Sequence, residues 1–91
     1  MEVVAYPVFE KDFKKLPNDV KDKVTEVYHT FLKTTNKDEL QKLPPMKKLT
    51  GHKNYYRFRI GDFRIGISIV ENTIYLHRVL NRREMYRYFP K

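Results

Sequence analysis

The chain has 91 residues, of which 41% are apolar and 14% aromatic, and this length supports one small domain over residues 1–91. It contains no cysteine, which excludes disulfides and thiolate metal sites and favours a reducing, cytoplasmic compartment. The formal net charge is +8, no stretch approaches the roughly 20 apolar residues of a membrane span, and the first residues lack the basic start of a secretory signal.

A strand and two amphipathic helices are predicted in the first third of the chain. Residues 2–6 are β-prone, and Pro7 ends this segment. One apolar stripe at helical spacing follows, and a second begins after the LPND motif, where Asn18 or Asp19 is a candidate N-cap. The second helix is expected to reach about Lys33, so the two helices form a hairpin packed on a flat surface. The stripes consist of Phe9, Phe13 and Leu16, and of Val20, Val24, Val27 and Phe31.

Residues 34–54 are predicted to connect the helices to a sheet. Residues 37–42 can add a helical turn, whereas Pro44 and Pro45 exclude a helix and a central strand. The predicted order of elements therefore places no strand in this connection.

From Tyr55 the apolar period changes to that of a strand, which predicts three strands. Gly61-Asp62 and Glu71-Asn72 are the turn signals between them. The basic and aromatic residues 81–91 predict one or two helical turns or an extended tail. We therefore expect an α+β fold with an N-terminal strand, a helical hairpin on one face of a small, largely antiparallel, twisted sheet, and a short basic C-terminal segment.

The positive charge lies entirely in the second half of the chain. Residues 1–46 contain eight lysines and eight acidic residues, whereas residues 47–91 contain eleven basic residues and three acidic ones. All seven arginines belong to the second half. The planar guanidinium of arginine suits phosphate better than the point charge of lysine does. This asymmetry indicates a polyanionic partner, and a solvated basic surface is the alternative.

Three arginines are predicted to share one face of a β-hairpin. With residues 61–62 as the loop, Arg59 pairs with Arg64 and, two positions along, Arg57 pairs with Gly66. Like charges placed opposite each other cost about 0.2–1 kcal/mol, so the cluster indicates a surface that binds phosphate. The missing side chain of Gly66 would leave a gap in which a ligand could lie.

The cluster also has a structural explanation, because a sheet face in water often carries arginine. Asp62 or Glu71 could pair with some of these cations, although three acids cannot neutralise eleven bases. Exposed aromatic rings between the basic residues could stack on nucleic-acid bases, at about 1–3 kcal/mol each. Of these residues, Tyr56 alternates in step with Phe58 and Ile60, so its ring is predicted to point into the core. The aromatic residues are Tyr55, Tyr56, Tyr75, Tyr86, Tyr88 and Phe89.

Four motifs of the second half are distinctive: Leu49-Thr50-Gly51, Tyr56-Arg57-Phe58-Arg59, Gly61-Asp62-Phe63-Arg64 and Arg82-Arg83-Glu84-Met85-Tyr86. With these motifs the chain resembles the RelE/ParE family of prokaryotic toxins from type II toxin–antitoxin pairs. The predicted order of strands and helices is also similar, and the resemblance covers almost the whole chain.

The resemblance implies one of two activities. Toxins of the RelE branch cleave mRNA in the ribosomal A site, without a metal or other cofactor, by attack of the 2′-hydroxyl on the adjacent phosphate. Toxins of the ParE branch inhibit DNA gyrase and lack the basic catalytic set. The arginines present here favour the RelE branch, whose partners are mRNA, the ribosome and a cognate antitoxin, with no membrane and no metal. A degenerate toxin that binds RNA without cutting it is a further alternative.

The family's site residues can be placed on this sequence by their motifs. Arg64 matches the arginine that binds the scissile phosphate, and Tyr86 matches the tyrosine that stacks on the substrate or helps remove the 2′-proton. Arg82 or Arg83 matches the arginine that assists the leaving oxygen, and the motif leaves this choice open. The residues implied to bind RNA are Arg57, Arg59, Lys48 and Lys53.

Asn81 departs from the family pattern, because many relatives carry a histidine at this position and some use it for proton transfer. Parity could place His77 on the arginine face opposite Gly66, but His77 and His52 are both interpreted as structural. Without a histidine, catalysis would rest mainly on orientation of the RNA and on stabilisation of charge by guanidinium groups. The three histidines are too dispersed for a metal site.

Overall fold

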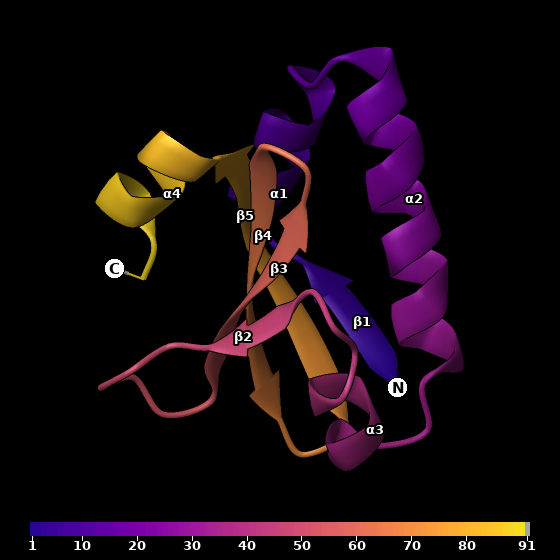
Figure 1. Cartoon of the computed structure of the whole chain (residues 1–91). Helices are drawn as coiled ribbons and strands as arrows, with labels where there is room; N and C mark the ends of the chain where they lie inside the picture. The colour runs from indigo at the N-terminus through magenta and orange to yellow at the C-terminus, as the bar shows by residue number, and fades with distance from the viewer. Residues whose placement is uncertain (91) are drawn as a thin grey trace.

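A five-stranded sheet lies between two layers of helices (Figure 1). The computed structural model describes residues 1–90, so Lys91, one of the basic residues of the C-terminal segment, lies outside the described residues. The elements, in chain order, are β1 (Glu2–Ala5), α1 (Pro7–Lys14), α2 (Asn18–Lys33), α3 (Lys37–Gln41), β2 (Met46–Lys48), β3 (Tyr55–Ile60), β4 (Phe63–Val70), β5 (Thr73–Asn81) and α4 (Arg82–Tyr88).

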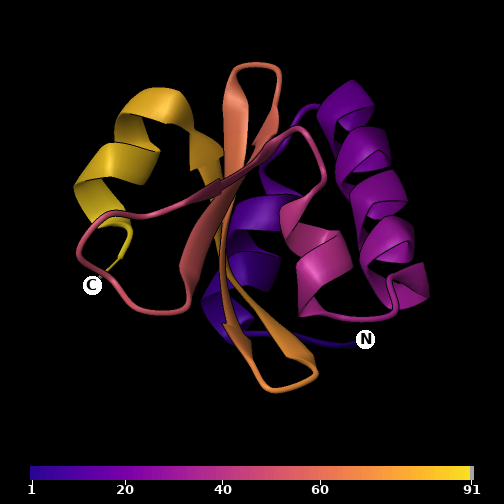
Figure 2. The ribbon, with the colours of Figure 1, turned by 60° about the horizontal axis from the view of Figure 1, so that its bottom comes forward.

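The strand order is β1-β5-β4-β3-β2, with β1 parallel to β5 and every other pair antiparallel. Figure 2 shows the sheet nearly on edge, with α1, α2 and α3 on one side and α4, in yellow, on the other. We call the side that carries α1 and α2 the inner face and the side that carries α4 the outer face. This arrangement confirms the predicted α+β fold, including the helical hairpin on one face of the sheet.

The predicted apolar stripes form the core on the inner face. Phe9 of α1 and the α2 residues Val20, Val24 and Phe31 are buried there. The ring of Phe31 meets that of Phe58 in β3 edge-on, with 5.3 Å between the ring centroids. Full burial of a side chain of this size contributes about 1.5–3 kcal/mol, so this contact anchors α2 to the sheet.

The β3–β4 hairpin has the predicted register. Arg59 pairs with Arg64, and Arg57 pairs with Gly66. Gly61 occupies the turn with φ of +57°, a left-handed conformation that favours glycine. The Gly61-Asp62 turn signal and the strand period were sufficient to predict this register, because both depend on residues that are close together in the sequence.

Two local predictions were wrong. Neither Asn18 nor Asp19 caps α2: Pro17 is the N-cap residue, and its fixed φ suits the extended conformation before the first turn. The connection at residues 34–54 was predicted without a strand, yet Met46–Lys48 forms β2 at the edge of the sheet. A strand of three residues is too short to show a period, and only its pairing with β3 defines it.

Residues 82–88 of the C-terminal segment form the helix α4, as the first of the two predicted alternatives had it. Asn81 caps α4: its side-chain oxygen accepts the backbone N–H of Glu84 at 2.9 Å, and its amide nitrogen donates to the Glu84 carboxylate at 2.9 Å. The first bond satisfies a backbone donor at the start of the helix, and the second holds the Asn81 side chain in position. Asn81 therefore has a structural task in place of the proton transfer that a histidine would perform.

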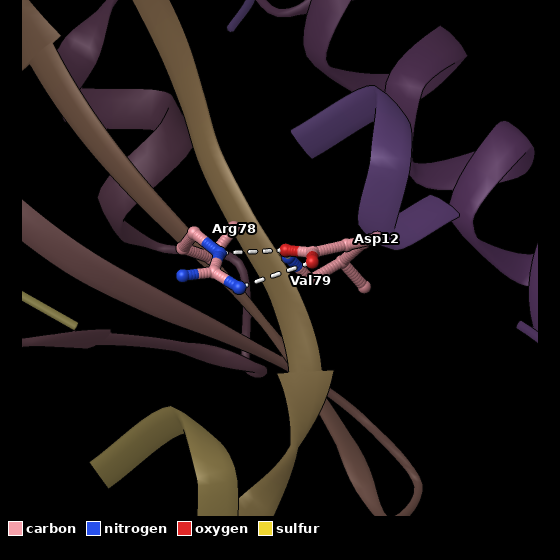
Figure 3. A network of polar contacts seen from close by, with 3 residues as sticks. All are labelled: Asp12, Arg78 and Val79. Carbon is pink, nitrogen blue, oxygen red and sulfur yellow. Dashed lines mark hydrogen bonds and ion pairs between the residues drawn. The ribbon is translucent and has the colours of Figure 1, made fainter. Parts of the chain in front are cut away.

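An ion pair that the sequence analysis missed joins α1 to β5 (Figure 3). Arg78 Nε donates to Asp12 Oδ2 at 2.7 Å, and a second guanidinium nitrogen donates to Oδ1 at 3.1 Å. The backbone N–H of Val79 donates to Oδ2 at 3.2 Å. This hydrogen bonding with Asp12 raises the pKa of Arg78 above its ordinary value. The pair fixes the position of the helical hairpin over the sheet.

Within residues 1–90, every helix is too short or too polar to cross a membrane.

Candidate nucleic-acid interface

A row of four cross-strand partners runs over the sheet from β2 to β5. Lys47 pairs with Arg57, Arg57 with Gly66, and Gly66 with Arg78. The pairing of Arg57 with Gly66 was predictable from the sequence, whereas Lys47 joins the row only through the pairing of β2 with β3. Three cations, one each on β2, β3 and β5, thus lie in one line across the sheet.

The central arginines line a groove of about 360 Å³, within the size range of ligand pockets. We call it the basic groove. Arg57 and Arg59 come from β3, Arg64 comes from β4, and Tyr86 reaches the groove from α4. Residues ahead of β3 form the remaining wall, and the sequence analysis did not identify them. These are Pro44, Pro45, Met46 and Lys47.

In the part of the chain that the structure describes, the guanidinium groups of the basic groove have no acidic partners. No carboxylate among residues 1–90 lies within 4.0 Å of Arg57, Arg59 or Arg64, so the predicted alternative of pairing with Asp62 or Glu71 is wrong. Arg64 instead donates to two main-chain carbonyls of the hairpin turn, Gly61 at 2.8 Å and Phe63 at 3.0 Å. These bonds orient Arg64 and leave its positive charge uncompensated.

The ring of Tyr86 stabilises the arginine cluster. The guanidinium carbon of Arg57 lies 4.5 Å from the ring centroid and that of Arg82 lies 5.9 Å from it, both within range of a cation–π interaction. Tyr86 itself is 56% exposed, so its ring is open to a ligand. Hydrogen bonding from Arg82, followed by the charges of Arg82, Arg57 and Arg64, lowers the pKa of the Tyr86 phenol below its ordinary value.

The structure brings some of the predicted site residues together and separates others. Arg82 and Arg83 both line a shallow surface depression with Asp62 and Glu84, and Arg82 also lies over the ring of Tyr86. The contact with Tyr86 thus distinguishes Arg82 from Arg83, although neither arginine is among the residues that line the basic groove. Lys53 is exposed on the loop before β3. It lines neither the basic groove nor a second cleft that adjoins it.

A second cleft of about 480 Å³ continues the basic groove. The two hollows share Lys47, Arg57 and Tyr86, so Tyr86 stands at the boundary between them. Lys48 and His52 line this second cleft. The predicted RNA-binding residue Lys48 is therefore near the site.

The expected gap at Gly66 is filled, so this prediction was wrong. A Cβ atom added to Gly66 would lie 2.7 Å from two carbons of the Phe89 ring. Phe89 is 3% exposed and its ring stacks on that of Tyr55, which makes both unsuitable for stacking on bases. Tyr56 is in the core, as its parity predicted.

His77 does not lie opposite Gly66, as parity had suggested. An irregularity in the β4–β5 register between Gly66 and Ile67 pairs Gly66 with Arg78 instead. His77 Nε2 shares a hydrogen bond of 2.7 Å with Ser68 Oγ, and burial lowers the pKa of the imidazole. His77 is therefore packed in the structure and is absent from the residues that line the basic groove.

The titration of Tyr86 tests this description of the site. We expect the Tyr86 phenol, followed by NMR of ring-labelled tyrosine, to ionise at a lower pH than the ordinary value of about 10. Arg82→Ala should raise this pKa, because hydrogen bonding from Arg82 is the main cause of its lowering. Arg83→Ala is the matched control and should leave it unchanged. Equal titrations in both variants would contradict the placement of Arg82 beside Tyr86.

This arrangement can bind a chain of phosphates. Uncompensated guanidinium groups provide charge and bidentate donors, an exposed ring provides a surface for stacking, and two connected hollows allow a ligand to extend. Among residues 1–90 there is no group of three or more histidine, aspartate or glutamate side chains arranged to hold a metal ion.

Comparisons with known proteins agree on one family. The family model of the ParE toxin of the type II toxin–antitoxin system parDE matches residues 5–86. Toxin RelE3 of Methanocaldococcus jannaschii is 34% identical over 90 residues, which cover 99% of this chain and 100% of the relative.

Solved structures show the same fold. The RelB–RelE antitoxin–toxin complex from Methanococcus jannaschii contains a chain that matches with a TM-score of 0.75 and 31% identity, over 96% of this chain and 99% of that one. The isolated RelE toxin of E. coli matches with a TM-score of 0.69 and 15% identity, over 94% of this chain and 90% of that one.

Proposed function

This chain belongs to the RelE/ParE family of type II toxin–antitoxin toxins, and from this premise we propose that it is an endoribonuclease of the RelE type. It cleaves mRNA in the ribosomal A site and so inhibits translation. Action on translating ribosomes implies the cytoplasm as its compartment.

The basic groove is the observation that supports this proposal. Arg57, Arg59 and Arg64 present positive charge that no carboxylate among residues 1–90 neutralises. A protein that holds like charges together loses stability, so the cluster calls for an anionic ligand that offsets this cost. A single RNA strand provides both the phosphates for the guanidiniums and a base for the exposed Tyr86 ring.

The reaction needs charge stabilisation more than it needs strong bases. The 2′-oxygen attacks the adjacent phosphorus, its proton is removed, and the bond to the 5′-oxygen of the next nucleotide breaks. Arg64 binds the scissile phosphate and stabilises the additional negative charge of the transition state, while Arg57 and Arg59 hold the backbone. Tyr86, whose pKa Arg82 and the neighbouring arginines lower, helps to remove the 2′-proton. The Arg82 guanidinium stabilises the negative charge on the leaving 5′-oxygen, which then takes a proton from water.

We also propose that an antitoxin neutralises this chain. The archaeal relative at 31% identity is in a complex with the antitoxin RelB. Two features of this chain suit such a partner: the basic groove, which suits an acidic segment, and an apolar cleft between α1 and α2, which suits apolar side chains. The cleft is lined by Phe9, Phe13, Val24, Tyr28 and neighbouring residues.

Primer extension on a message translated in vitro tests the proposed function. We expect new 5′ ends within codons when the protein is added to translating ribosomes, and none on the same message without ribosomes. Uncut transcripts with RNA binding would indicate a non-catalytic relative, the alternative that the use of Asn81 as a helix cap favours. Intact translation with DNA breaks would instead indicate an inhibitor of gyrase.

A further inference from the structure

Three aromatic rings of the C-terminal segment lie on one row of the sheet. Tyr86 lies over Arg57 at 4.5 Å and Tyr88 lies over Arg78 at 5.5 Å, measured from the guanidinium carbon to the ring centroid. Between these two arginines the row contains Gly66, and the ring of Phe89 lies directly on it. The C-terminal segment therefore contacts three neighbouring strands through rings.

Phe89 makes the tightest of these contacts. Three of its ring carbons would lie 2.7, 2.7 and 2.9 Å from a Cβ atom at position 66, distances that real Cβ atoms do not show. The ring also stacks on Tyr55, with 5.6 Å between the centroids, and packs with Leu49 and Met85 in a separate small cluster on the outer face. Only glycine on β4 lets the ring approach this closely.

The position of Tyr86 depends on this cluster. The helix α4 has seven residues, too few to be stable by itself, so packing must hold it in place. Tyr86 is exposed and cannot anchor the helix, whereas Met85 is fully buried and Phe89 almost so. These two anchors lie on either side of Tyr86 in the chain, and Phe89 N–H donates to the Met85 carbonyl at 3.0 Å.

We propose that Phe89 is a positioning residue for the cleavage reaction: its ring, packed on Gly66, holds α4 so that Tyr86 stays on the Arg57 guanidinium. This inference rests on the proposed function, since it assigns Phe89 an effect on a proposed catalytic residue. Phe89 lines the second cleft but is only 3% exposed, so its ring has little surface to offer to a ligand. It acts only through the placement of Tyr86.

Two single variants loosen this contact from opposite sides. Phe89→Ala removes the ring, and Gly66→Ala adds a methyl group that displaces it while the strand conformation of residue 66 still accepts alanine. In each variant we expect the pKa of Tyr86 to rise toward its ordinary value of about 10, because the phenol moves away from its cations. Tyrosine NMR, assigned with Tyr86→Phe, measures this shift in the free protein.

The same variants should lower kcat on programmed ribosomes by about 10²-fold with a much smaller change in KM, since a displacement of about 1 Å has an effect of this size. Phe89→Leu retains an apolar anchor and should restore most of the activity. In the double variant Gly66→Ala/Phe89→Ala the added methyl meets no ring, so the loss should equal that of Phe89→Ala alone.

Tyr75→Leu is the matched control, because it also removes an aromatic ring from the sheet. The Tyr75 ring stacks on that of Tyr6, and Tyr75 lines neither the basic groove nor the second cleft. This variant should leave the Tyr86 titration unchanged. An unchanged Tyr86 titration in Phe89→Ala and Gly66→Ala, or additive losses in the double variant, would overturn the inference. If the wild-type protein leaves mRNA uncut, the proposed function fails, while the titration still decides whether Phe89 positions Tyr86.

Discussion

Replacing Arg64 with alanine is expected to lower the rate of mRNA cleavage on the ribosome by about 10²–10³-fold, the usual effect of removing one donor that stabilises transition-state charge. Arg64 is oriented by its bonds to the Gly61 and Phe63 carbonyls, and no carboxylate among residues 1–90 reduces its charge. A guanidinium fixed in this way needs little reorganisation when the phosphate gains charge. Single-turnover primer extension measures the rate.

Two further variants make this prediction specific. Arg87→Ala removes the same charge from an exposed position of α4 that lines neither hollow, and it should leave the rate nearly unchanged. Arg64→Lys keeps the charge but loses the planar fork, so we expect an intermediate rate. Thermal unfolding of each variant controls for the lost bonds to the hairpin turn. A rate for Arg64→Ala equal to that of Arg87→Ala would remove Arg64 from the mechanism.

Replacing Asp12 with alanine is expected to cost about 3–5 kcal/mol of the free energy of unfolding, as breaking one side of a buried ion pair does. Asp12 is 8% exposed and accepts three hydrogen bonds, two from Arg78 and one from the Val79 N–H. All three donors would lose their acceptor. The total free energy of unfolding of a small domain is about 5–15 kcal/mol, so this variant should unfold at a much lower urea concentration than the parent.

Asp22→Ala is the control for this experiment, because it removes the same charge from an exposed position of α2. The urea concentration at the midpoint of unfolding should be nearly the same for Asp22→Ala as for the parent protein. The double variant Asp12→Leu/Arg78→Met should recover much of the loss, since apolar replacement of both partners leaves no unpaired charge. Equal midpoints for Asp12→Ala and Asp22→Ala would show that the pair does not stabilise the fold.

Much of the fold and part of the site were predictable because the signals involved are local. The strand period from Tyr55 and the Gly61-Asp62 turn act over a few residues, and together they placed Arg59 opposite Arg64, as the structure confirms. The helical stripes likewise placed Phe9 and Phe31 in the core. The charge asymmetry identified the half of the chain that supplies the arginines of the basic groove.

What the sequence by itself determined is thus the class of the fold, the hairpin register and the arginine face, all of which depend on period, turn and charge. Only the tertiary structure decided which residues complete the site. It placed Lys47 beside Arg57 through a three-residue edge strand, set the guanidinium of Arg82 over the ring of Tyr86, and put Phe89 into the space above Gly66. It also joined Asp12 to a partner 66 residues away. These contacts depend on how separate elements pack against each other, and no period or spacing within one segment contains that information.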